Sequence, residues 1–204
     1  MSEKNMWAIE EELYGQGIVS ICGVDEAGRG PLAGPVCAAA VILPEDCELP
    51  GLDDSKKLSE KKREALYDVI CRKAISYGIA FSAVEEIEEL NILSAALLAM
   101  NRSIAQLDPA PELALIDGNT TRTIAIPARS IVGGDGKCAC IAAASVLAKV
   151  TRDRYMCELA EQYPQYGFEK HKGYGTKAHY AAVEEFGLCP AHRPSFFKKY
   201  YAKR

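Results

Sequence analysis

The chain has 204 residues, of which 49% are hydrophobic and 25% charged, and its net charge is −4. This length and composition suit one globular domain over residues 1–204 and exclude a disordered or fibrous chain. No apolar run reaches the roughly 20 residues that span a bilayer, and the N-terminus shows no signal-peptide pattern, so we expect a cytoplasmic protein without a membrane segment.

The first half of the chain predicts a pair of strands followed by helices. A helix is expected over 6–14, strands over 18–25 and 36–43, a helix over 59–75 with Ser59 as its N-cap, and a strand over 78–84. The first two strands are joined by a Gly/Pro-rich turn over 28–35. This turn is too short for a crossover helix, so the two strands should pair antiparallel.

The second half predicts strands that alternate with helices. We expect helices over 85–90 and 92–106, strands over 113–116 and 124–132, a long alanine-rich helix over 137–162, a helix over 177–186 and a short basic end. Pro127 interrupts the second of these strands. The pattern predicts an α/β fold, a mixed sheet flanked by helices, with a basic C-terminal helical segment from about residue 168.

Charge is distributed unevenly along the chain. Residues 168–204 contain eight Lys or Arg and three Asp or Glu, a net charge of +5, together with all three histidines, and residues 1–167 carry −9. An acidic body with a basic segment suits an enzyme that binds metal with one part and a polyanion with another. A solvated basic tail has the same composition, so charge alone leaves both interpretations open.

The eight cysteines do not form a disulfide framework. Several lie in apolar stretches, Cys138 and Cys140 are separated by one residue, and the sequence contains no C-x-x-C pair of the kind that indicates a zinc site. We therefore expect reduced thiols that act as small hydrophobic side chains.

Asp25 and Glu26 lie at the end of a predicted buried strand, and Gly28, Arg29 and Gly30 come next. Carboxylates beside a core need compensation, which a divalent cation usually supplies. The glycines let backbone N–H groups approach a ligand, and the planar guanidinium of Arg29 matches phosphate oxygens. Acids that hold metal beside donors that hold phosphate predict a site that cleaves phosphodiesters.

Asp117 and Asp135 are the candidates that complete the acidic site. Asp117 ends a predicted strand, and Asp135 lies in a Gly-rich turn before the long helix. Each taken singly is also typical of an ordinary turn or helix cap. Neighbours on a regular strand point to opposite faces, so Asp25 and Glu26 share one site only if the strand bends or Glu26 reaches around.

Two further residues are candidates for substrate contacts. Lys56 suits a phosphate contact, although helix capping also explains its segment. Tyr174, flanked by glycines and basic residues, suits stacking on a sugar or base, although loops often expose a tyrosine. Lys149 and Asp153 have helical i, i+4 spacing and are predicted to form a structural ion pair.

Six ordered motifs resemble those of bacterial ribonuclease HII, a type 2 ribonuclease H, between about residues 18 and 195. The motifs are Asp25–Val36, Asp54–Ser59, Ile116–Gly118, Gly134-Asp135 ahead of Ala142–Ser145, Ala148–Arg154, and His171–Tyr174. One motif could match by chance, but six in order are characteristic of the family. The resemblance implies a ribonuclease H-like fold with a mixed five-stranded sheet, flanking helices and a C-terminal helical extension.

The resemblance also implies an activity. Members of this family are endonucleases that hydrolyse the RNA strand of RNA–DNA hybrids and incise on the 5′ side of single ribonucleotides in duplex DNA, as in ribonucleotide excision repair. It implies a two-metal mechanism with Mg²⁺ or Mn²⁺, the two ions lying roughly 3.5–4 Å apart with substrate bound. The expected partners are hybrid and ribonucleotide-containing duplexes, and the expected state is a monomer.

The family's site residues transfer onto this chain by motif. The metal-binding acids fall on Asp25, Glu26, Asp117 and Asp135, and substrate recognition falls on Gly28, Arg29, Gly30 and Tyr174. Gly133 stands where some members carry a lysine.

Two other functions are compatible with parts of this pattern. In a non-catalytic hybrid-binding protein the acids would only cap turns, and metal dependence of cleavage separates that protein from a nuclease. A carboxylate-pair hydrolase of sugars is the second. The Gly-Arg-Gly element and the basic segment argue against it, because a neutral sugar needs neither.

Overall fold

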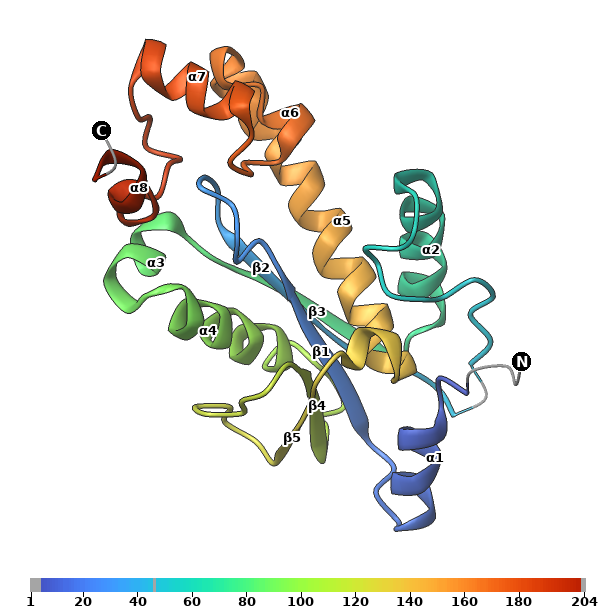
Figure 1. The fold of residues 1–204 in the computed structure, drawn as a ribbon. Helices are drawn as coiled ribbons and strands as arrows, with labels where there is room; N and C mark the ends of the chain where they lie inside the picture. Colours follow the sequence, from blue (N-terminus) through green and yellow to red (C-terminus); the bar gives the residue numbers. More distant parts are fainter. Residues whose placement is uncertain (1–4, 46, 203–204) are drawn as a thin grey trace.

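The computed structural model describes residues 5–45 and 47–202, and its centre is a five-stranded sheet (Figure 1). The strands, in chain order, are β1 (Ile21–Ala27), β2 (Val36–Ile42), β3 (Ser76–Ser82), β4 (Leu113–Asp117) and β5 (Ala128–Ile131). Their spatial order is β3-β2-β1-β4-β5. β2 pairs antiparallel with both β1 and β3, whereas β4 lies parallel to both β1 and β5. The predicted mixed five-stranded sheet is therefore confirmed.

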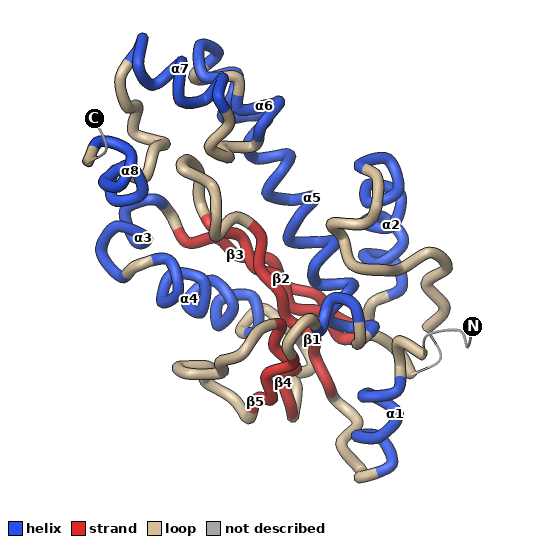
Figure 2. Tube along the Cα trace, in the orientation of Figure 1, coloured by secondary structure: helices blue, strands red, loops and turns tan. Residues whose placement is uncertain are grey.

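Helices cover both faces of the sheet, as Figure 2 shows. They are α1 (Ala8–Gly15), α2 (Glu60–Lys73), α3 (Val84–Leu90), α4 (Ile92–Ile104), α5 (Ala139–Gln162), α6 (Phe168–His171), α7 (Lys177–Phe186) and α8 (Pro194–Tyr201). α1, α2 and α5 pack on one face and α4 on the other, each over its own apolar core. None of the described helices is both long and apolar enough to cross a membrane.

The alternation of β1 decides which face each of its side chains reaches. Ile21 and Ala27 contribute to the core under α5, whereas Cys22 and Val24 contribute to the core under α4. A Cβ on Gly23 would lie 2.1 Å from the backbone carbon of Cys140, so α5 rests directly on β1 there. By the same alternation the side chain of residue 25 lies on the α5 face and that of residue 26 on the α4 face.

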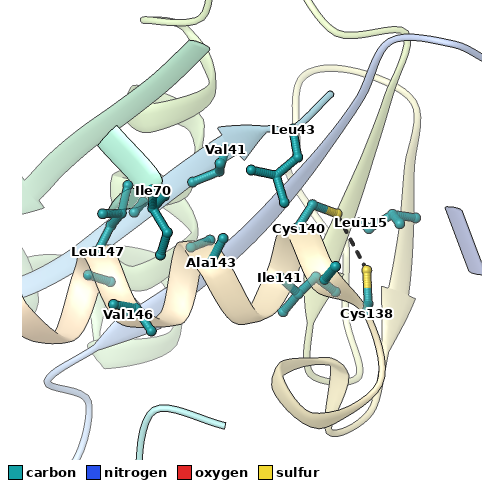
Figure 3. Close-up of a cluster of buried hydrophobic side chains, with 14 of the residues drawn as sticks. Val41, Leu43, Ile70, Leu115, Cys138, Cys140, Ile141, Ala143, Val146 and Leu147 are labelled. Atoms are coloured by element: carbon teal, nitrogen blue, oxygen red, sulfur yellow. Dashed lines mark hydrogen bonds between the residues drawn. The ribbon is translucent and has the colours of Figure 1, made fainter. Parts of the chain in front are cut away.

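The alanine-rich sequence of α5 allows this close packing. Figure 3 shows Ala143 and Leu147 of α5 beside Val41 of β2 and Ile70 of α2, all within the buried core of this face. Complete burial of a side chain such as Leu147 is worth about 1.5–3 kcal/mol. The helix is thereby fixed against the sheet, and so are the polar residues it carries.

Most element boundaries match the prediction, and the exceptions have physical causes. β5 covers only 128–131 because Pro127 has no N–H to donate; its carbonyl accepts from Ala114 N at 2.9 Å. A 3₁₀ turn over Gly134–Gly136 delays the start of α5 to Ala139. The segment expected to be a short basic end contains α8, which begins with Pro194 and buries Phe197 completely.

Candidate active site

Three predicted acids meet at one edge of the sheet. β4 runs parallel to β1 with Val24 opposite Ile116, and β5 runs parallel to β4. Parallel strands end at the same edge, so Asp25, Asp117 and the turn after β5 that holds Asp135 are brought together. Carboxylate oxygens of these three residues lie within 4.8 Å of one another.

Glu26 approaches from the opposite face of the sheet. The pairing of β1 with β2 continues regularly through Glu26–Ala38 and Ala27–Cys37, so the strand is not interrupted at the acids. Glu26 lies outside the group of three acids. It nevertheless lines a cavity that Asp25 and Asp117 also line and that extends to Ile92 of α4. Of the two routes considered from the sequence, the structure therefore has Glu26 reaching around the end of the sheet.

Eight of the nine predicted site residues line one cavity of about 500 Å³: Asp25, Glu26, Gly28, Arg29, Gly30, Lys56, Asp117 and Tyr174. The ninth, Asp135, lies next to it and is 6% exposed. Lys56 joins Asp135 to the cavity, because its Nζ donates to Asp135 Oδ2 at 3.0 Å. Residues from five separate regions of the sequence thus form one site.

Lys56 places a positive charge beside the acids. Burial lowers the pKa of Lys56, but the hydrogen bond and charge of Asp135, with the charge of Asp25, outweigh it and raise the pKa above the usual lysine value. Helix capping, the alternative considered from the sequence, is performed by Ser59, which accepts from Lys62 N at 3.3 Å. The side chain of Lys56 is therefore free of a capping role.

Burial makes the charged forms of Asp25 and Glu26 energetically costly. Burial raises the pKa of Asp25 well above its usual value, and the charges of Glu26 and Asp117 raise it further, against a hydrogen bond from Ser145 and one from Glu26 N at 2.7 Å. Burial also raises the pKa of Glu26, although Arg29, whose Nη1 donates to Glu26 Oε1 at 3.1 Å, opposes it. A divalent cation removes this cost, and an all-carboxylate ligand set suits Mg²⁺ or Mn²⁺.

Sequence reasoning missed two serines at the floor of the cavity. Ser145 of α5 and Ser55 both line it, and their Oγ atoms lie 2.8 Å apart. The signal was available, because Ser145 interrupts a continuous apolar stretch of α5. The predicted ion pair of Lys149 with Asp153 is present at 2.7 Å, and Lys149 lines the cavity as well.

Two buried arginines hold the segment 28–35 that contains Arg29. Arg193, which has no exposed surface, donates to the carbonyls of Gly28 (2.7 Å), Arg29 (3.2 Å), Pro31 (2.9 Å) and Gly34 (2.6 Å). Arg152 donates to the carbonyls of Ala33 (3.1 Å), Pro35 (3.0 Å) and Lys172 (3.0 Å). The conformation of this segment is therefore set by side chains far away in the sequence.

Tyr174 stands against the same segment. Leu32 N donates to Gly173 O at 2.8 Å, and a Cβ on Gly30 would lie 3.6 Å from the Tyr174 ring. Tyr174 is 46% exposed, and the buried His179 holds its backbone, with Nδ1 2.9 Å from the Tyr174 carbonyl oxygen. An exposed aromatic face thus lies beside the backbone of the Gly-Arg-Gly element.

Gly28→Ala is expected to destabilise the protein by about 2–5 kcal/mol. Gly28 has φ +101°, which strains any other residue, and a Cβ there would lie 2.0 Å from Arg152 Nε. Urea unfolding measures the change. Gly51→Ala is the matched control, because Gly51 has φ +83° and open space around its Cβ position. Equal costs at the two positions would contradict a role for the Arg152 contact.

Comparison with known proteins identifies the family. The family model described as ribonuclease HII matches residues 22–202. Ribonuclease HII of Endomicrobium trichonymphae is 53% identical over 193 residues, covering 94% of this chain and 92% of that protein.

Two solved structures show the same fold. Ribonuclease H2 from Pyrococcus horikoshii OT3 matches with a TM-score of 0.73 at 24% identity, covering 90% of this chain and 98% of that one. Bst-RNase HIII, solved in complex with Mn²⁺, matches with a TM-score of 0.68 at 17% identity, covering 91% and 70%. With the motifs and the sheet order, these similarities establish that the chain belongs to the ribonuclease HII family and is a metal-dependent ribonuclease.

Proposed function

We propose that this protein hydrolyses the RNA strand of RNA–DNA hybrids and incises on the 5′ side of single ribonucleotides embedded in duplex DNA. One observation carries the proposal: Asp25 and Asp117 line one cavity together with a guanidinium and an exposed tyrosine, and Asp135 lies beside it, with a carboxylate oxygen within 4.8 Å of theirs. The family is that of ribonucleases, and a cavity that combines these groups suits a ribose phosphate. We place this activity in ribonucleotide excision repair in the cytoplasm, carried out by a monomer with one catalytic domain.

Asp25, Asp117 and Asp135 would hold the metal, with Glu26 completing the ligand set from the opposite face. Mg²⁺ or Mn²⁺ bound there would supply an activated water and would stabilise the leaving 3′ oxygen. Glu26 N orients Asp25 by donating to its Oδ1 at 2.7 Å, and Gly134 N fixes Asp117 by donating to its Oδ1 at 2.7 Å. These contacts hold the carboxylates in place before substrate binds.

Arg29, Tyr174 and Lys56 would bind the substrate. The Arg29 side chain is 49% exposed while one of its N–H groups binds Glu26, which leaves other donors for a phosphate. The backbone at Gly28 and Gly30 approaches the ribose closely, and the Tyr174 ring stacks on the sugar at the junction with DNA. The 2′-hydroxyl distinguishes RNA from DNA, so these residues would discriminate a ribonucleotide from a deoxyribonucleotide.

The basic C-terminal region would grip the duplex outside the cavity. Lys170 of α6 and Lys177 of α7 are exposed and flank the loop of Tyr174. Their contacts would go to backbone phosphates, which strengthen binding without sequence preference and make it sensitive to salt.

Asp117→Asn is expected to lower the cleavage rate by about 10³-fold while leaving hybrid binding largely intact. The substitution removes one anionic ligand, and a loss of about 4 kcal/mol in transition-state stabilisation corresponds to that factor. The assay uses a DNA duplex with one ribonucleotide beside an all-RNA/DNA hybrid, with and without Mg²⁺, and maps the product ends.

Asp68→Asn is the matched control, because Asp68 is an exposed carboxylate on α2. Full activity of the Asp117 variant would remove Asp117 from the mechanism. If the protein binds the hybrid in the presence of EDTA and leaves it uncleaved at every metal concentration, the result would favour a non-catalytic hybrid-binding protein.

A further inference from the structure

A second group of metal-ligand side chains lies outside the acidic site. Ligand atoms of Glu10, Cys138 and Cys140 lie within 4.8 Å of one another, and all three residues are buried. Glu10 comes from α1, whereas the two cysteines lie at the start of α5, where Figure 3 shows their sulfurs facing each other. The C-x-C spacing alone did not indicate a metal site, because the third side chain comes from 128 residues away.

Helix capping explains only one oxygen of Glu10. Its Oε1 accepts from Cys140 N at 3.0 Å and from Cys138 Sγ at 3.2 Å, at the N-terminus of α5, where negative charge is favourable. Glu10 Oε2 is buried and finds no hydrogen-bond partner among the described residues. An unpaired buried carboxylate oxygen is costly. Capping therefore leaves Glu10 Oε2 unexplained.

We propose that Glu10, Cys138 and Cys140 bind one thiophilic divalent cation of the Zn²⁺ class. Thiolates select Zn²⁺ over the hard cations Mg²⁺ and Ca²⁺, and a carboxylate is an accepted third ligand. Three protein ligands leave one tetrahedral position for a water. The chemistry differs from that of Asp25, Asp117 and Asp135, whose oxygen-only set suits Mg²⁺ or Mn²⁺.

Both cysteines are available as ligands. The sulfurs of Cys138 and Cys140 are free thiols 3.4 Å apart, well beyond the roughly 2.05 Å of a disulfide bond. On binding, each thiol loses its proton to solvent, so three anionic ligands and one dication leave a net charge of −1. The cation meanwhile gives Glu10 Oε2 a partner.

The cation would fasten α1 to the start of α5. These segments already touch through Ala139 N, which donates to Met6 O at 2.8 Å, and Cys138 N donates to Gly134 O at 2.9 Å. Asp135 lies between Gly134 and Cys138 in the chain, so the site borders the turn that carries an active-site acid. Glu10 precedes the part of the chain that the family model matches, residues 22–202, so the site draws on a residue beyond that match.

Cobalt binding tests the proposal directly. The full-length protein is reduced, freed of metal with a chelator, and titrated with Co²⁺, which substitutes for Zn²⁺ and reports thiolate ligands by charge-transfer absorption. We expect one equivalent to produce the thiolate band, Zn²⁺ to abolish it and raise the thermal midpoint, and Mg²⁺ to do neither. Glu10→Gln should weaken binding by about tenfold to a hundredfold while keeping the band.

The cysteine variants locate the ligands. Cys138→Ser with Cys140→Ser should remove the band, whereas Cys189→Ser, which changes the thiol 3.2 Å from His192 Nδ1, should leave it unchanged. If the double variant fails to fold, alkylation of the native protein tests the proposal instead. Zn²⁺ should then protect Cys138 and Cys140 from alkylation. Absence of the band at stoichiometric Co²⁺, its loss only in the Cys189 variant, or protection of other thiols would overturn the proposal.

Discussion

Asp25→Asn is expected to lower the rate of hydrolysis by about 10³-fold and, in the metal-free protein, to increase the free energy of unfolding. Asp25 is 3% exposed and lies among other carboxylates, so its charge destabilises the metal-free fold. Asparagine keeps the shape and the hydrogen bond to Ser145 but removes the charge. Loss of one metal ligand should lower the cleavage rate by about 10³-fold, equivalent to about 4 kcal/mol.

The stability difference between the Asp25→Asn variant and the unaltered protein should depend on pH. The pKa of Asp25 is raised in the folded protein, chiefly by burial and then by Glu26 and Asp117, so the folded state binds more protons than the unfolded state. The contribution of Asp25 to stability is complete below its usual pKa of about 3.8 and is lost as pH rises toward the raised pKa. The stability advantage of the variant should therefore grow between pH 4 and the raised pKa.

Urea unfolding in EDTA at a series of pH values measures this advantage. Asp68→Asn, the exposed control on α2, should change neither the activity nor the slope of stability against pH. A variant at position 25 that loses activity and stability together would contradict the electrostatic account, because it would assign Asp25 a purely structural role.

Arg193→Lys is expected to lower the free energy of unfolding by about 3 kcal/mol and to raise KM by roughly tenfold. The guanidinium of Arg193 donates to four carbonyls of the segment that carries Arg29. Lysine has three donors on a flexible side chain and cannot reproduce the planar arrangement of N–H donors of a guanidinium, so buried carbonyls lose their hydrogen-bond partners. Arg29 and the Gly-Arg-Gly backbone then lose their fixed position.

Unfolding in urea and steady-state kinetics on a single-ribonucleotide duplex measure the two effects. Arg122→Lys is the matched control, because Arg122 is exposed. An unchanged KM, combined with lowered stability, would show that Arg193 supports the fold without positioning the substrate-binding segment.

The sequence was most informative where chemistry and local structure coincide. Asp117 ends β4 and Asp25 lies near the end of β1. Strand ends gather at one edge of a sheet, so the convergence of these two acids follows from strand periodicity and from the parallel pairing of β1 and β4. The strands and long helices were predictable because their apolar periodicity is local. α8 was missed because it is short, begins with Pro194, and owes its helix to the burial of Phe197.

By itself the sequence determined the fold class, the acidic cluster and the family, because all three depend on residue types in a fixed order. Only the tertiary structure decided how Glu26 reaches the cavity, which arginines hold the Gly-Arg-Gly segment, and that Glu10 meets Cys138 and Cys140. These arrangements join residues from distant parts of the chain, and spacing along a sequence contains no information on contacts that the packing of α5 and α1 against the sheet creates.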